Sequence, residues 1–177
     1  MKVRNSDIHF IDEGDGIGVL IIHGSGASLS AWTSLSDELV KKGFRVVALD
    51  LPGGGLSTSP QAYNFTLEDD ISLVFEFLKE IEFKPQIVLG HSTGGQLAWT
   101  ASLRNPDAFE KLILVSPTGM PVQIPIAWRM AKIPLLGELM TKISPEFIVR
   151  MNLEDVFYDD NLISDNLVQR YHSFILR

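Results

Sequence analysis

The sequence predicts an α/β protein built on a mostly parallel sheet with flanking helices. Apolar runs at residues 19–22, 45–49 and 111–115 lack the polar alternation of a half-exposed strand, as expected for strands covered on both faces. Segments with apolar residues at helical spacing, residues 31–42 and 67–81, separate these runs. Strands and helices that alternate over short links predict parallel neighbours joined by right-handed crossovers.

Turn and cap residues mark the ends of these elements. Residues 8–11 form a short strand, and the Gly14-Asp15-Gly16 turn joins it to the first buried run. Gly43 stands where a glycine ends the helix before it, and Thr66 stands where a hydroxyl caps the next helix. The acids that follow this cap are interpreted as solvated charges of the first helical turn: Glu68, Asp69 and Asp70.

Composition and charge exclude several classes of protein. The 177 residues are 45% hydrophobic and 21% charged, the balance of a folded globular chain. A net charge of −7 argues against nucleic acid or an anionic membrane as partner. The chain has no cysteine, which excludes disulfides, thiolate metal sites and a cysteine nucleophile. The N-terminus is polar and no apolar run approaches a membrane span, so we expect a cytoplasmic protein.

The pattern Gly-x-Ser-x-Gly at residues 90–94 is the main chemical signal in the chain. It lies between an apolar run at 86–89 and a helical segment at 96–103. A serine needs an exposed oxygen, small neighbours and nearby backbone donors to act as a nucleophile. A sharp turn from strand to helix supplies all three, because free N–H groups and the positive helix end then face the serine. The spacing therefore predicts a nucleophile elbow centred on Ser92.

Three ordered motifs together carry a resemblance to a known family. The elbow, His23-Gly24-Ser25-Gly26 upstream of it, and the Asp-x-Pro-Gly-rich loop at 50–57 between them resemble the α/β-hydrolase fold family, in its serine-nucleophile branch. The resemblance implies that Ser92 is the nucleophile and that the backbone N–H of Thr93 is one oxyanion donor, with Ser25 or Gly26 as the other. It also places Gly90, His91 and Gly94 in the nucleophile elbow. His23 and Gly24 are placed in the oxyanion loop.

The sequence does not match the common cofactor-binding and metal-binding motifs. A dinucleotide fingerprint beginning at Gly24 would need a third glycine where the chain has Leu29. The glycines at 53–55 are not followed by the Lys-Ser/Thr of a phosphate-binding loop, and the histidines lack metal-ligand spacing. We therefore expect no cofactor and no metal.

The composition changes after residue 119. Residues 1–119 are predicted as the N-terminal part of the hydrolase core, and residues 120–177 as a helical cap over the nucleophile. Four prolines interrupt the first half of this cap: Pro121, Pro125, Pro134 and Pro145. A last helix is expected at 164–176.

The predicted catalytic machinery is incomplete. In the family the acid and the base follow the nucleophile along the chain, after the last strands. No strand signal follows residue 119, so we expect the C-terminal part of the core, with the triad acid and base, to be absent. Only His172 follows Ser92, and a surface histidine is the preferred interpretation of it. The strand at 111–115 would then expose its edge, which favours self-association.

The sequence thus leaves two hypotheses. The leading one is a serine hydrolase that acts on an ester or similar acyl bond of a small apolar substrate, selected by the cap. Cleavage of a carbon–carbon bond next to a carbonyl is a variant of the same chemistry. The alternative is a non-catalytic fragment or binding module that keeps the pocket without the triad acid and base.

Overall fold

The computed structural model describes residues 1–60, 63–120, 146–155 and 157–175. The chain divides into two compact units, Met1–Met120 and Pro121–Arg177, and each has its own apolar core. The proline-punctuated part of the predicted cap, residues 121–145, lies outside the described residues.

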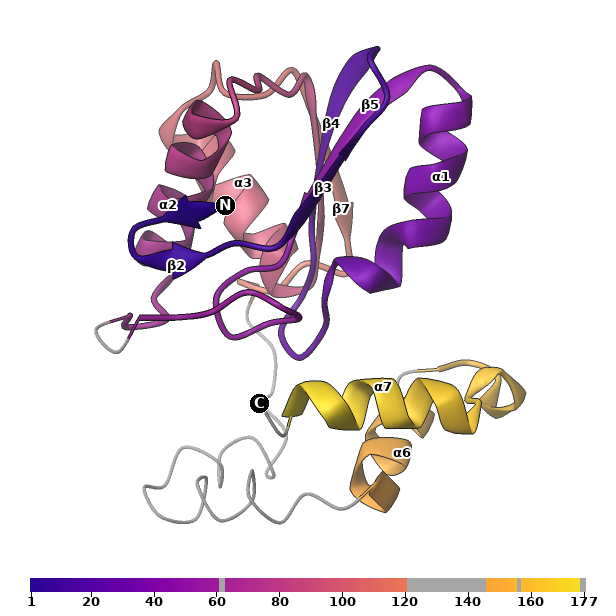
Figure 1. Cartoon of the computed structure of the whole chain (residues 1–177). Helices are drawn as coiled ribbons and strands as arrows, with labels where there is room; N and C mark the ends of the chain where they lie inside the picture. Colours follow the sequence, from indigo (N-terminus) through magenta and orange to yellow (C-terminus); the bar gives the residue numbers. More distant parts are fainter. Residues whose placement is uncertain (61–62, 121–145, 156, 176–177) are drawn as a thin grey trace. The chain divides into compact units, whose positions relative to one another are not determined.

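A five-stranded sheet forms the centre of the first unit, and it confirms the mostly parallel α/β fold predicted from the sequence (Figure 1). Only the first strand in the spatial order is antiparallel to its neighbour. A small separate hairpin, β1 (Lys2–Val3) and β2 (Ser6–Asp7), precedes the sheet. The spatial order of the sheet is β3 (Phe10–Glu13), β5 (Phe44–Leu49), β4 (Ile17–Ile22), β6 (Ile87–His91) and β7 (Lys111–Val115).

The first strand of this sheet differs from the prediction. It begins at Phe10 rather than at residue 8. It pairs with β5 and not with β4, which follows it in sequence; the sequence analysis had assigned no partner to this strand. The turn between β3 and β4 is where the sequence placed it, and Gly14 adopts a φ of +80° there. Because β4 already has parallel partners on both sides, β3 cannot pair with it, and it pairs instead at the outer edge of β5.

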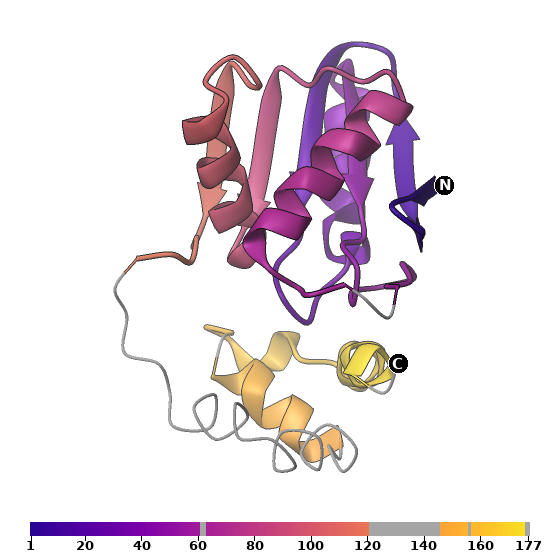
Figure 2. The ribbon, with the colours of Figure 1, turned by 90° about the vertical axis from the view of Figure 1, so that its left-hand side faces the viewer.

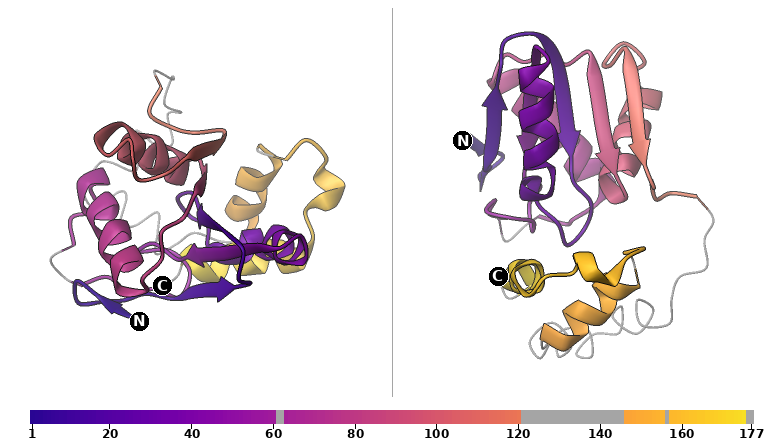
Figure 3. Two further views of the ribbon diagram at one scale, coloured as in Figure 1. Left: turned by 90° about the horizontal axis from the view of Figure 1, so that it is seen from above. Right: turned by 90° about the vertical axis from the view of Figure 1, so that its right-hand side faces the viewer.

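Helices cover both faces of the sheet. On one face lie α2 (Leu67–Glu80) and α3 (Thr93–Arg104), side by side in Figure 2. On the other face lie η1 (Leu29–Trp32) and α1 (Thr33–Lys41), as the right-hand view of Figure 3 shows.

The side chains of β4 explain why both faces are covered. Leu20 and Ile22 pack in the core on the side of α2 and α3, whereas Val19 and Ile21 pack in the core that contains Leu29. All four β4 residues are almost fully buried. A strand apolar at every position can be buried only between two layers of helix, which is the environment that its sequence predicts.

The helix caps also follow the sequence. The Thr66 hydroxyl accepts a hydrogen bond from the Asp69 N–H, 3.1 Å away, and so satisfies one of the free donors at the start of α2. Gly43 has a φ of +81° just after α1, the left-handed conformation that ends many helices. These caps fix where the loops between helices and strands begin.

The described part of the second unit is helical. Its elements are α6 (Glu146–Glu154), η2 (Asp160–Leu162) and α7 (Asp165–Ile175), close to the helix predicted at 164–176. No helix among the described residues of either unit is long and apolar enough to cross a membrane. The core of the second unit is small and apolar: Val149, Leu153, Ile163 and Val168.

Among the strands that the structure describes, β7 is an edge of the sheet in the first unit. The Lys111 N–H donates to the Gln86 carbonyl, and the Val115 carbonyl accepts from the Ser92 N–H. Alternate residues of a strand direct their polar groups to opposite sides, so the N–H and C=O of Leu112 and Leu114 point away from β6. Four consecutive apolar residues of this strand are 38–45% exposed: Leu112, Ile113, Leu114 and Val115.

An apolar edge strand is expected to pair with another chain, so we predict that this polypeptide self-associates through β7. The substitution Leu112→Lys should lower the associated fraction, because a lysine on an edge strand opposes pairing. Leu103→Lys is the matched control, since Leu103 is 72% exposed on helix α3 and is not part of the strand. Light scattering coupled to size exclusion measures the effect. A monomeric wild-type chain, or equal effects of the two variants, would contradict the prediction.

Candidate active site

Ser92 lies at a sharp turn between β6 and α3, as the elbow motif predicts. Its backbone has φ 51° and ψ −117°, a conformation that a residue with a side chain adopts only under strain. The Ser92 N–H donates to the Val115 carbonyl at 3.0 Å, and its own carbonyl accepts from the N–H groups of Gln96 and Thr118. These bonds hold the strained backbone in place. The half-buried hydroxyl has no hydrogen-bond partner among the residues that the structure describes.

Glycines allow the chain to pack closely around this turn. A Cβ on Gly94 would collide with the carbonyl oxygens of Ile22 and His23, and a Cβ on Gly90 would collide with the backbone of Gly94. A Cβ on Gly24 would lie 2.9 Å from the Cβ of Ser92, closer than such atoms approach. The loop after β4 is therefore in direct contact with the elbow.

Backbone donors flank Ser92 on two sides. Thr93 begins α3, so its N–H has no carbonyl one turn earlier in the helix to bond. On the loop after β4, the Ser25 N–H donates to the Thr93 hydroxyl oxygen at 2.8 Å, and the two hydroxyl oxygens are 3.1 Å apart. The Gly26 N–H has no acceptor within the described parts of the chain, and Gly26 has a φ of +70°.

His23 holds this loop in place as a neutral ring. Its Nδ1 lies 2.7 Å from the Gly24 carbonyl, which can only accept, so Nδ1 carries the proton. Its Nε2 then accepts from the Leu51 N–H at 2.9 Å. Burial lowers the pKa of His23 below its ordinary value of 6.5, although the Gly24 carbonyl and Asp50 favour the charged form. Both ring nitrogens are occupied, so His23 cannot serve as the base for Ser92.

Asp50 links three segments beneath the loop, a role that the sequence analysis did not assign. Its buried carboxylate accepts from the Leu29 N–H at 2.7 Å and the Leu56 N–H at 2.8 Å. One of its oxygens also lies 2.8 Å from Nδ1 of His9, which the structure places just before β3 rather than within a strand. The position of Asp50 directly after a buried strand, before Pro and Gly, is the signal that could have revealed this junction.

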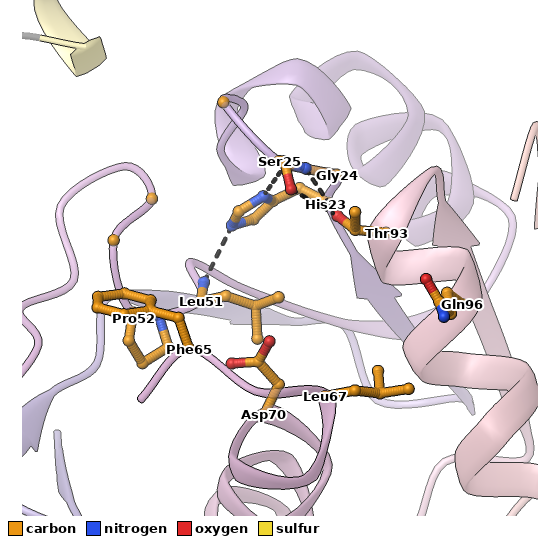
Figure 4. Close-up of a pocket in the computed structure, with 13 residues that line it drawn as sticks. His23, Gly24, Ser25, Leu51, Pro52, Phe65, Leu67, Asp70, Thr93 and Gln96 are labelled. Atoms are coloured by element: carbon orange, nitrogen blue, oxygen red, sulfur yellow. Dashed lines mark hydrogen bonds between the residues drawn. The ribbon is translucent and has the colours of Figure 1, made fainter. Parts of the chain in front are cut away.

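A pocket of about 360 Å³ has in its wall Thr93, the residue that follows Ser92 in the chain (Figure 4). The loop after β4, from His23 to Gly26, which the sequence analysis predicts as the oxyanion loop, forms one side of it together with Thr93. Gln96 of α3 and Asp70 of α2 also line it, with apolar residues between them: Leu51, Pro52, Phe65 and Leu67.

The interpretation of the first-turn acids of α2 as solvated charges is wrong for Asp70. Its carboxylate is half-buried in the pocket wall and accepts a hydrogen bond from the Tyr63 hydroxyl, 2.6 Å away. Burial raises the pKa of Asp70, and the Tyr63 hydroxyl partly offsets this effect. Burial also raises the pKa of Tyr63. The other two acids do face solvent or a cap: Glu68 pairs with Arg104, and Asp69 bonds the Thr66 hydroxyl.

The remaining histidines do not reach the elbow hydroxyl with any described hydrogen bond. His91 is half-buried beside the ring of Trp32, with ring centroids 6.0 Å apart, and burial lowers its pKa. His172 belongs to the second unit, on α7, with Nδ1 3.9 Å from a carboxylate oxygen of Glu146. Its assignment as a surface histidine rather than a base stays a prediction. No group of three or more His, Asp or Glu side chains among the described residues could hold a metal ion.

Comparison with known proteins decides the family. A family profile described as alpha/beta hydrolase fold matches residues 18–148. The chain belongs to this family. The match extends from β4 through the elbow and into the second unit, so the fold inferred from three short motifs is confirmed.

Two curated relatives of this hydrolase-fold chain that are named as hydrolases match nearly its whole length. The 2-hydroxymuconate semialdehyde hydrolase of Pseudomonas sp. (strain CF600) is 29% identical over 169 residues, which cover 93% of this chain and 56% of that protein. The 2-hydroxy-6-oxononadienedioate/2-hydroxy-6-oxononatrienedioate hydrolase of Comamonas testosteroni is 30% identical over 175 residues, 94% of this chain and 59% of that protein.

Solved structures show the same fold. The meta-cleavage product hydrolase of Pseudomonas fluorescens IP01 has a TM-score of 0.82 at 23% identity, over 99% of this chain and 62% of that one. The epoxide hydrolase CorEH has a TM-score of 0.83 at 23% identity, over 98% of this chain and 66% of that one. The chain thus spans 56–59% of the length of the two curated relatives above.

Close packing at the elbow predicts a large effect of one added methyl group. Gly94→Ala should destabilise the first unit by roughly 3 kcal/mol, because a methyl group there meets backbone carbonyls that cannot move aside. Gly26→Ala is the control: its Cβ would meet nothing within 4 Å, so only the positive φ costs energy, about 1 kcal/mol. Urea unfolding measures both. Equal losses of stability would contradict the packing argument.

The bonding of His23 predicts a pH dependence of stability. Its pKa is lowered on folding, so the folded state binds fewer protons than the unfolded state below pH 6.5. The stability that neutral His23 contributes is therefore present above pH 6.5 and is lost as pH falls toward the folded pKa. Urea unfolding at several pH values should show that the free energy of unfolding falls less steeply below pH 6.5 for His23→Gln than for the wild type. An equal dependence of the unfolding free energy on pH in both proteins would contradict the assignment of His23 as neutral.

Proposed function

We propose that the chain is the nucleophile-bearing part of a serine hydrolase that acts on an ester or similar acyl bond of a small apolar substrate. The observation that carries this proposal is the strained turn at Ser92, with φ 51° on a residue that is not glycine. Strain of this kind persists only where the surrounding structure enforces it, and it is concentrated at functional sites. In the proposed reaction the Ser92 hydroxyl oxygen attacks the acyl carbon, and the carbonyl oxygen becomes an oxyanion.

Two backbone amides are the proposed oxyanion donors. The Thr93 N–H is free at the start of α3, where the helix dipole also favours negative charge. Gly26 is favoured over Ser25 as the second donor, because the Ser25 N–H already donates to the Thr93 hydroxyl. That bond would instead fix the loop against the elbow and hold the Gly26 amide ready.

The chemistry of a serine nucleophile favours acyl transfer over epoxide opening. An aspartate nucleophile would suit an epoxide, and Ser92 stands at that position here. The curated relatives named above act on semialdehyde and dioate substrates by their names, so cleavage of a carbon–carbon bond beside a carbonyl is a further candidate. The same oxyanion donors would serve both reactions, and we retain the ester as the first substrate to test.

No histidine among the described residues of the first unit is hydrogen-bonded to the Ser92 hydroxyl, so a base for it is not evident there. The ring nitrogens of His23 are both engaged. The family places acid and base after the nucleophile, in a region that the chain, at 56–59% of the length of its curated relatives, does not span in full. We therefore expect this chain alone to retain only the contribution of the oxyanion site and substrate binding.

The proposal predicts a weak but specific esterase activity. The purified chain should accelerate hydrolysis of p-nitrophenyl acetate by up to ~10³-fold over water, the level that remains when triad members are removed. Ser92→Ala should leave much of this turnover, because the oxyanion site and substrate binding do not require the hydroxyl, but it should abolish labelling of the chain by a fluorophosphonate. Ser102→Ala is the matched control, since Ser102 lies on the same helix α3 and donates to the Ala98 carbonyl.

Three results distinguish the hypotheses. Loss of fluorophosphonate labelling in Ser92→Ala with full labelling in Ser102→Ala supports the nucleophile. Equal labelling of both variants would contradict it. No acceleration by the wild-type chain, combined with no labelling of Ser92 by a fluorophosphonate in a peptide map, would favour the non-catalytic binding module.

A further inference from the structure

The pocket beside Ser92 contains one carboxylate that the proposed reaction does not use. The Tyr63 hydroxyl donates to one oxygen of Asp70, and the other oxygen has no hydrogen-bond partner among the described residues. Figure 4 shows the Asp70 carboxylate directed from α2 toward Leu51, with Leu67 and Phe65 also on the pocket wall. A half-buried oxygen with spare acceptor capacity in an apolar wall is a position where a donor on a ligand would be stabilised.

The tyrosine fixes the direction of this carboxylate. The 2.6 Å bond from Tyr63 holds the Asp70 side chain in one rotamer, which lowers the entropy lost when a ligand binds the free oxygen. The Tyr63 ring in turn packs edge-on against Phe65, with ring centroids 5.1 Å apart. The carboxylate is therefore part of a built wall rather than a mobile surface group.

No described residue that lines the pocket carries a formal positive charge. Its wall contains no Lys or Arg, and its histidine, His23, is held neutral by its two hydrogen bonds. A ligand carboxylate in this pocket would therefore meet the negative charge of Asp70 without a compensating cation. A hydroxyl or ammonium group would instead find an acceptor.

We propose, on the basis of the function proposed above, that Asp70 determines specificity by accepting a hydrogen bond from a hydroxyl or ammonium group at the end of an apolar substrate chain. Substrates whose chain ends in a carboxylate are excluded from this pocket. The polar end binds Asp70, the apolar part lies against Leu51 and Leu67, and the acyl carbon lies toward the Thr93 side of the pocket. The Comamonas testosteroni relative has a dioate in its name, so the proposal separates this chain from that substrate class.

Three five-carbon ligands that differ only in their end group test this inference. Pentylammonium, 1-pentanol and pentanoate have no acyl bond to cleave, so their binding does not depend on Ser92 chemistry. Dissociation constants come from ¹H–¹⁵N NMR titrations at pH 8, read from the side-chain amide of Gln96 and the backbone amide of Thr93, both in the pocket wall.

Three variants separate the effect of the Asp70 carboxylate from those of overall charge and of Ser92. Asp70→Asn keeps the shape of the side chain and an acceptor for Tyr63, so it should fold, which the backbone NMR spectrum checks. Glu80→Gln is the matched control, because it removes one negative charge from the other end of the same helix, α2. Ser92→Ala is the second control and should bind all three ligands as the wild type does.

We expect the wild type to bind pentylammonium about fivefold more tightly than pentanoate, the size expected for a partly exposed ion pair. Asp70→Asn should abolish this preference, and Glu80→Gln should keep it. Equal binding of pentylammonium and pentanoate by the wild type would overturn the proposal, as would an unchanged preference in Asp70→Asn or no binding at the reporter amides. If esterase activity is absent but the preference for pentylammonium holds, the result counts against Ser92 as the nucleophile and not against the role of Asp70.

Discussion

The site depends on how closely three backbone segments approach one another. Gly94 at the start of α3 lies against the carbonyls that end β4, Gly90 lies against Gly94, and Gly24 lies against Ser92. Any side chain at these positions would push the segments apart. Because they touch, the chain must reverse within one residue, and Ser92 takes up the unfavourable φ of 51°. The strained turn is thus a consequence of packing between the sheet and α3.

The same edge of the sheet gathers every polar element of the site. β4, β5 and β6 are parallel, so the loops that leave their carboxyl ends meet above that edge. His23 and Asp50 then connect those loops through backbone N–H groups: Leu51 donates to His23, and Leu29 and Leu56 donate to Asp50. Loop positions that would otherwise be mobile are therefore fixed by buried hydrogen bonds.

The sequence predicted what depends on local pattern and missed what depends on distant contacts. The buried strands and the elbow could be predicted, because continuous apolar runs and spaced glycines have few alternative structures. The pairing of β3 with β5 could not, since it depends on which edges of the sheet remain open. Asp70 looked like an ordinary first-turn acid, and only the approach of Tyr63 and the oxyanion loop encloses it. The roles of Ser92, Thr93 and Gly26 remain predictions.

The central claim is that the amides of Thr93 and Gly26 are already directed at the oxygen that forms when Ser92 reacts. The most direct measurement is the ¹H–¹⁵N NMR spectrum of the chain before and after a phosphonate is attached to Ser92. We expect these two amide protons to shift downfield together, since both would donate to the phosphonyl oxygen. The amide shifts elsewhere in β4 and α3 should stay unchanged. An adduct in which neither amide shifts, or in which the whole elbow rearranges, would contradict it.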